Sequence, residues 1–263
     1  PCSLLDPRGI LQACECMTMS GKVRLGMMTP SSNTVLEPVT SGLLRAAPHI
    51  SAHFQRFRVT QIALAEAALS QFDPEQMMPA AEMLADAKVH AIAWNGTSAS
   101  WLGFERDEAL CAAIKLRTGI PATSSTLACR EALRRCGAKK IGLVTPYTDD
   151  VQARILEVWG AQGFDCSHEV HLGWSDNFSF CEADESLIAD MVCNVVARGC
   201  DAVVILCTNM IGARVCEELE LELEVPLLDS VAVTLWHTLE IAGATGSLKR
   251  GGRIFHDPIF RPR

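Results

Sequence analysis

The sequence is poor in aromatic residues and carries no excess of positive charge. Only 6% of its 263 residues are aromatic, with a single tyrosine, and the formal net charge is −8. A face that binds nucleic acid needs clustered basic residues to displace counterions from phosphates, so this charge balance argues against nucleic acid as a partner. No apolar run approaches the roughly 20 residues that cross a bilayer, so we expect no membrane segment.

The spacing patterns of metal and nucleotide sites are also missing. Of the seven histidines only His49 and His53 are four residues apart, in an expected strand, and the twelve cysteines include no C-x-x-C pair, so we expect no metal centre. Neither G-x-x-x-x-G-K-[ST] nor G-x-G-x-x-G occurs, so we expect no nucleotide cofactor. Nothing at the start of the chain has the charged and apolar regions of a secretory signal. We therefore interpret the cysteines as reduced residues of a cytoplasmic protein.

From Lys22 onward, short apolar runs alternate with helical patterns. Strands are expected over 22–29, 49–60 and 89–94, and helices over 37–46, 74–87 and around 105–117. This alternation predicts an α/β protein with parallel β-α-β units in doubly wound sheets. Residues 1–21 show no sustained period, and we interpret them as a loose leader.

The same order of features then occurs a second time. "KVRLGMMTPSSN" (22–33) matches "KKIGLVTPYTDD" (139–150), and "VHAIAWNGTS" (89–98) matches "CDAVVILCTN" (200–209). A third pair is "TGIPATSS" (118–125) and "LEVPLLDS" (223–230). Three matched pairs in one order predict an internal duplication with pseudo-two-fold symmetry.

The duplication predicts two halves with a cleft between them. We expect 22–122 plus 229–263 in the first half and 123–228 in the second, with the C-terminal helix 230–243 packing back on the first. Ligands of parallel sheets bind beyond the carboxyl ends of the strands. The two Thr-Pro turns, including Pro30, and the two turns at Gly96 and Cys207 should therefore line one cleft.

Cys207 is the strongest catalytic candidate in that cleft. It follows the apolar run "AVVIL", and we expect it at the N-terminus of a helix, where free N–H groups favour a reactive thiolate. The alternative is one more buried cysteine among twelve. Thr208 follows it, as Thr97 follows Gly96, and the glycine should leave open space for a substrate.

Hydroxyl and amide side chains complete the candidate site. Thr97 and Ser98 offer an anion cradle, with capping of the next helix as the alternative. Tyr147 lies in the second Thr-Pro turn, where a phenol could donate to an oxyanion, or be an ordinary aromatic. Asn33 and Asn177 lie in turn-like stretches and, as bare residues, are typical turn formers.

These motifs together resemble the aspartate/glutamate racemase superfamily. "TPSSNTVLEP", "DNF" and "CTN" are similar to maleate cis-trans isomerases, whereas "GTSASW" is similar to arylmalonate decarboxylases. Racemases of this superfamily use two cysteines, one on each face of the substrate carbon, and the isomerases also use two. Here Gly96 stands at the first position and only Cys207 remains. Decarboxylation needs a single acid, and it is the reaction that we expect.

The resemblance also implies roles for the other residues. Cys207 would protonate an enediolate that Thr97, Ser98, Tyr147 and the backbone near Thr208 hold, and Asn33 and Asn177 would contact a substrate carboxylate. No cofactor is implied. The expected substrate is a small disubstituted malonate or related dicarboxylate, and a homo-oligomer is compatible with the sequence. An isomerase or racemase, or a binding protein for small anions, is the alternative.

Overall fold

A computed structural model describes residues 21–246, 248 and 251–261 of the chain. The leader predicted over residues 1–21 lies, apart from Gly21, outside the described residues. Within the part of the chain that is described, no helix has the length and apolar character needed to cross a membrane.

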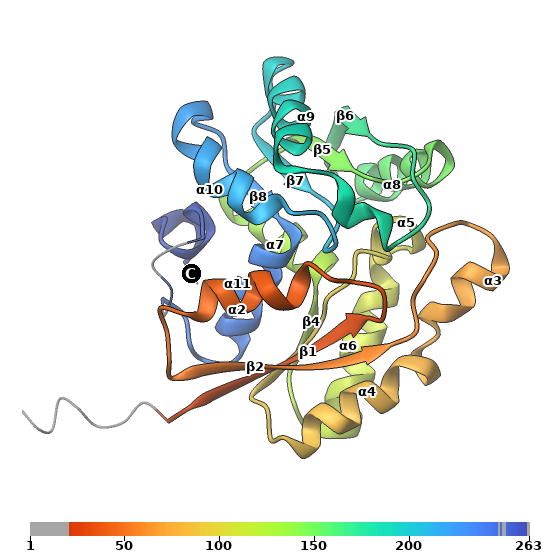
Figure 1. The fold of residues 1–263 in the computed structure, drawn as a ribbon, viewed down its shortest axis with the longest axis vertical. Helices are drawn as coiled ribbons and strands as arrows, with labels where there is room; N and C mark the ends of the chain where they lie inside the picture. Colours follow the sequence, from red (N-terminus) through yellow and green to blue (C-terminus); the bar gives the residue numbers. More distant parts are fainter. Residues whose placement is uncertain (1–20, 247, 249–250, 262–263) are drawn as a thin grey trace, which may run out of the picture.

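The strands form two parallel sheets with the same neighbour order. The first has the order β2-β1-β3-β4 and the second β6-β5-β7-β8 (Figure 1). The strands of the first sheet are β1 (Val23–Pro30), β2 (Ile50–Phe57), β3 (Ala91–Trp94) and β4 (Ala122–Ser124). Those of the second are β5 (Lys140–Thr145), β6 (Asp165–His171), β7 (Ala202–Ile205) and β8 (Leu227–Asp229). The predicted α/β duplication is confirmed, because each half repeats one parallel topology.

Helices cover the sheets and cross between the halves. The α-helices are α2 (Leu36–Leu44), α3 (Glu66–Leu69), α4 (Pro74–Asp86), α5 (Ala99–Leu102), α6 (Phe104–Thr118), α7 (Ser125–Cys136), α8 (Asp149–Ala161), α9 (Glu185–Ala197), α10 (Gly212–Leu223) and α11 (Ser230–Ile241). Short 3-10 helices are η1 (Ser70–Phe72), η2 (Ser179–Glu182), η3 (Arg253–Phe255) and η4 (Pro258–Phe260). Helix α11 follows the second sheet but packs against β3, β4 and α2 of the first half, as predicted (Figure 1).

Burial explains why the central strands read as continuous apolar runs. Every residue of β3 and β7 is buried, as expected for parallel strands covered on both faces. Side-chain caps then fix where the next helices begin. Ser124 accepts a hydrogen bond from the Leu127 N–H at the start of α7, and Asp229 accepts two from the first turn of α11.

The second strand is shorter than predicted because its end pairs across the molecule. β2 ends at Phe57, whereas the sequence predicted a strand to residue 60. Ile62 N–H donates to the Ser175 carbonyl, and Asn177 N–H donates to the Thr60 carbonyl at 3.1 Å. Residues 58–73, which we call the cover segment, thus attach the first half to the second.

Candidate active site

The predicted strand ends of both halves meet at one place. The Thr208 hydroxyl donates to the Asn95 carbonyl at 3.0 Å, which joins the turn after β7 to the turn after β3. The Thr97 and Tyr147 hydroxyls are 2.7 Å apart, which joins the turn after β3 to the turn after β5. The predicted cleft is therefore built from side chains of both halves.

A small cavity lies between these turns. Its volume is about 20 Å³, close to the space of one water molecule. Eight of the nine predicted site residues line it: Pro30, Gly96, Thr97, Ser98, Tyr147, Asn177, Cys207 and Thr208. The sequence did not point to its apolar walls, which are Val59, Ile62, Phe72, Trp94 and Trp101. Three of these, Val59, Ile62 and Phe72, belong to the cover segment, whose long-range pairing has no local sequence signal.

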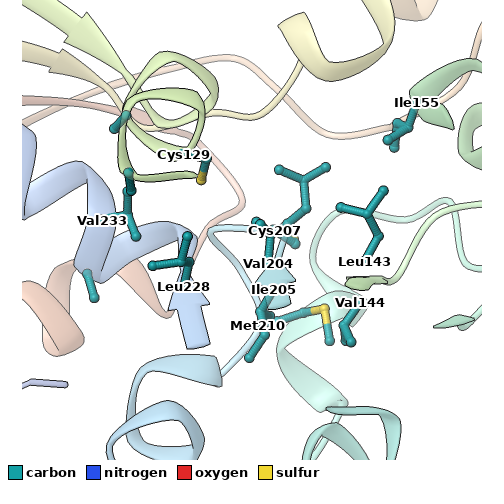
Figure 2. Close-up of a cluster of buried hydrophobic side chains, with 14 of the residues drawn as sticks. Cys129, Leu143, Val144, Ile155, Val204, Ile205, Cys207, Met210, Leu228 and Val233 are labelled. Carbon is teal, nitrogen blue, oxygen red and sulfur yellow. The ribbon is translucent and has the colours of Figure 1, made fainter. Parts of the chain in front are cut away.

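Cys207 lies in the cavity wall with an almost completely buried thiol. Figure 2 shows it among apolar side chains that include Ile205 and Met210. Burial raises the pKa of the Cys207 thiol to about 12, and the nearby Asp229 carboxyl also raises it. The Asn209 N–H and the Tyr147 hydroxyl act in the opposite direction. The thiol therefore keeps its proton at neutral pH.

The predicted helix N-terminus at Cys207 is wrong. Helix α10 begins only at Gly212, after a turn through Thr208 to Ile211. Cys207 therefore lacks the row of free N–H groups that lowers a thiol pKa at the first turn of a helix. Its sulfur accepts a hydrogen bond from the Asn209 N–H at 3.4 Å, and the Met210 N–H also lowers the thiol pKa.

Hydrogen-bond donors surround the cavity. Among the residues that the structure describes, none accepts a hydrogen bond from the Ser98 hydroxyl or from the backbone N–H groups of Thr97, Ser98 and Thr208. Burial raises the pKa of Tyr147 well above its usual value, so its phenol stays a donor. Free N–H and hydroxyl groups at one cavity can bind and stabilise an oxyanion.

The two predicted asparagines have structural contacts of their own. The Asn33 amide donates to the Thr208 carbonyl and hydroxyl, at 3.0 and 3.1 Å, and its oxygen caps the first turn of α2. Asn33 therefore lies behind Thr208 and outside the cavity lining. Asn177 does line the cavity, and its amide donates to the Ser32 hydroxyl at 2.7 Å.

A third asparagine, Asn209, was missed by the sequence reasoning. Its oxygen accepts from Thr34 N–H at 2.9 Å and its amide donates to the Asn177 carbonyl at 2.6 Å. It thus links the turn after β7 to the start of α2 and to the segment that pairs with the cover. The signal was present in "CTN", where Asn209 follows Cys207 and Thr208 directly.

The sequence predicted that Gly96 leaves open space for a substrate, and this prediction is wrong. A Cβ atom built on Gly96 would overlap three atoms of the Trp94 indole. The backbone at Gly96 is outside the left-handed region, so the indole and not the backbone excludes a side chain.

The described residues give the cavity no charged side chain. No lysine, arginine, aspartate or glutamate is among the described residues that line it. In the described part of the chain, no group of three or more histidine, cysteine, aspartate or glutamate side chains is placed to hold a metal ion. A bound dianion would therefore be held by N–H and hydroxyl donors.

Comparison with known sequences identifies the family. The profile of the arylmalonate decarboxylase family matches residues 34–255. A maleate isomerase of Geobacillus stearothermophilus is 27% identical over 84% of this chain and 92% of its own length. The arylmalonate decarboxylase of Bordetella bronchiseptica is 26% identical over 62% of this chain and 69% of its own length.

Solved structures share the fold. A maleate isomerase of Pseudomonas putida S16 with maleate superposes with a TM-score of 0.82 at 20% identity, covering 91% of this chain and 99% of the other. An arylmalonate decarboxylase variant in a liganded form superposes with a TM-score of 0.78 at 21% identity, covering 89% and 99%. With most of its length matched by the family profile, the chain belongs to the arylmalonate decarboxylase family.

Proposed function

We propose that this chain is a cofactor-independent decarboxylase of a small disubstituted malonate, in which Cys207 is the proton donor. The observation that carries the proposal is a cavity with one protonated thiol, Cys207, and with Gly96 at the equivalent position of the other half. A two-base racemase needs a second thiol on the opposite face of the substrate. An isomerase needs a thiolate that adds to the alkene. Cys207 and Gly96 provide neither.

In the proposed reaction the bond between the central carbon and one carboxylate breaks, and its electron pair moves into an enediolate as CO2 leaves. Thr97, Ser98, Tyr147 and the Thr208 N–H stabilise the two enediolate oxygens, because preorganised donors bind the charge that develops in the transition state. The Cys207 S–H then gives its proton to the central carbon. Solvent returns a proton to the thiolate and completes the cycle.

The raised pKa of Cys207 suits this role. An enediolate carbon is a far stronger base than a thiolate, so a thiol with a pKa of about 12 can still protonate it. A nucleophile would need to be a thiolate at neutral pH, and burial opposes that state. The cavity of about 20 Å³ is smaller than a malonate, so its walls must separate when substrate enters.

A maleate isomerase is the second candidate, favoured by the names of several relatives and by Asn177 in the cavity. The Nocardia farcinica enzyme, in a cysteine-to-serine form, carries a covalently bound succinylcysteine intermediate. We place the chain on the decarboxylase side because its buried thiol is protonated. As the twelve cysteines suggest, we place the reaction in the cytoplasm.

The test is a comparison of substrates in heavy water, followed by NMR. We expect the parent protein to convert phenylmalonate to α-deuterated phenylacetate and CO2 and to leave maleate unchanged. Conversion of maleate to fumarate without CO2 release would instead assign the isomerase. α-Deuteration of aspartate would assign a racemase, and binding of these anions without turnover a binding protein.

A further inference from the structure

The duplication makes Trp94 and Ile205 equivalent residues. Trp94 is the last residue of β3 and Ile205 the last of β7, and each strand holds the third place in its sheet. Gly96 and Cys207 each follow two residues later. A side chain at residue 96 would therefore take the place that the Cys207 thiol takes in the other half.

The Trp94 indole occupies that place. A Cβ atom on Gly96 would overlap Cε2, Cζ2 and Cη2 of Trp94, so the six-membered ring of the indole lies against the Gly96 turn. Ile205 is directed elsewhere: a Cβ atom built on Gly212, at the start of α10, would lie 2.9 Å from Ile205 Cδ1. The second half thus leaves room for a thiol, and the first half fills it with an aromatic ring.

Other aromatic rings hold the indole in position. The Phe57 and Phe72 ring centroids lie 5.0 and 6.4 Å from that of Trp94. Trp94 is 1% exposed and is also part of the cavity wall. A large side chain packed on several sides cannot turn aside without opening the core.

We propose that Trp94 is the specificity-determining residue of this site: its indole covers the substrate face opposite Cys207 and limits the group that fits there. This inference rests on the proposed function. With that face covered by an apolar ring, protonation occurs only from the Cys207 side and yields one enantiomer. The substituent that packs against the indole is apolar and flat or small, such as an aryl or a methyl group. Bulky branched substituents are excluded.

The first test needs no activity. We compare thermal unfolding of the parent, Trp94→Ile, Gly96→Cys and the double variant, where Trp94→Ile copies the residue at the end of β7. Gly96→Cys alone should lower Tm by roughly 5–10 °C, because it overpacks the core, and should cost much less in the Trp94→Ile protein. Equal Tm losses in the two backgrounds would overturn the claim that the indole fills the place of a second side chain. Trp159→Leu is the control for loss of a buried indole, since Trp159 is buried but outside the cavity lining.

The second test follows the stereochemistry on methyl(phenyl)malonate in heavy water. The parent should give one enantiomer of 2-phenylpropionate and no exchange of the product α-hydrogen. Trp94→Ile should accept a substituent at least one methylene larger. The double variant, with thiols on both faces, should exchange the α-hydrogen and racemise the product. A folded double variant without exchange, together with an unchanged size limit in Trp94→Ile, would overturn the specificity role. If the parent releases no CO2, the proposed function fails, and the unfolding cycle still decides where the indole lies.

Discussion

The turns after β3 and β7 occupy equivalent positions in the two sheets but present different side chains. The turn after β7 presents the Cys207 thiol, whereas the turn after β3 presents no side chain at Gly96 and lies against the Trp94 indole. Both turns keep a threonine next, Thr97 and Thr208, and both of these line the cavity. One half of the duplicated site therefore presents a thiol, and the other presents hydroxyl and N–H donors. The Trp94 indole fills the space that a side chain at residue 96 would need.

The two Thr-Pro turns also differ, in the residue that follows the proline. In the second half Tyr147 follows Pro146 and lies against Thr97 and Cys207. In the first half Ser31 follows Pro30, and its hydroxyl donates to the Val59 carbonyl of the cover segment. The second half therefore places a phenol at the cavity, where the first half attaches the cover segment.

The largest effect is expected from Cys207→Ala. Loss of the proposed proton donor should lower kcat on phenylmalonate by at least about 1000-fold, within the range for general acid catalysis. The fold should survive because a buried thiol contributes little volume. Cys216→Ala is the matched control, since Cys216 is equally buried but outside the cavity lining. Activity of Cys207→Ala within twofold of the control would remove Cys207 from the reaction.

A smaller loss of kcat is expected when one hydroxyl donor of the cavity is removed. Tyr147→Phe and Ser98→Ala should each lower kcat by roughly 10- to 1000-fold, the range for loss of one oxyanion donor, with a smaller change in KM. Ser31→Ala removes the hydroxyl at the position equivalent to Tyr147 and should leave kcat nearly unchanged. Steady-state kinetics on phenylmalonate measure all three. A rise in KM at constant kcat in Tyr147→Phe would make the phenol a binding contact only.

A smaller effect is expected for thiol reactivity. The sequence predicted fast alkylation of Cys207, and the structure reverses that expectation because burial raises the pKa of its thiol to about 12. Iodoacetamide at pH 8 should label the exposed Cys193 roughly 100-fold faster or more, since only the thiolate reacts. Peptide mass spectrometry over time gives both rates. Labelling of Cys207 first would contradict the protonated thiol on which the proposed reaction depends.

Several features of the site could be predicted from the sequence, and others could not. Apolar runs and matched turns are local patterns, and they placed Gly96, Cys207 and Tyr147 at strand ends that face each other. The direction of the Trp94 indole depends on Phe57 and Phe72, which come from distant segments. The pKa of Cys207 depends on its burial in the folded protein, and the spacing of residues in the sequence does not predict that burial.

The smallest effect is expected on stability and compares the caps of α7 and α11. Ser124 caps the first and Asp229 the second, and burial raises the pKa of Asp229 to about 7 from an ordinary value of 3.8. The folded protein must keep this carboxyl protonated at pH values where the unfolded chain has released the proton. Stability should therefore fall as the pH rises from about 4 to about 7.

Asp229→Ser gives the second half the cap of the first and tests this pH dependence. Urea unfolding at pH 5 and pH 8 should show a loss of unfolding free energy with pH that is roughly 1–3 kcal/mol smaller in the variant than in the parent. Asp107 is a second buried carboxyl with a pKa of about 7, so part of the parent's pH dependence should persist in the variant. Identical pH dependence in both proteins would show that Asp229 does not titrate as its burial requires.

In the proposed reaction a single thiol, on one face of the substrate, delivers the proton that completes the product. The most direct measurement is decarboxylation of methyl(phenyl)malonate by the parent protein in heavy water, with the product analysed by chiral chromatography and NMR. We predict CO2 release and a single enantiomer of 2-phenylpropionate with one α-deuterium, unchanged on prolonged incubation. A racemic product, or continued exchange of its α-hydrogen, would contradict an account in which Cys207 is the sole acid and Trp94 covers the opposite face.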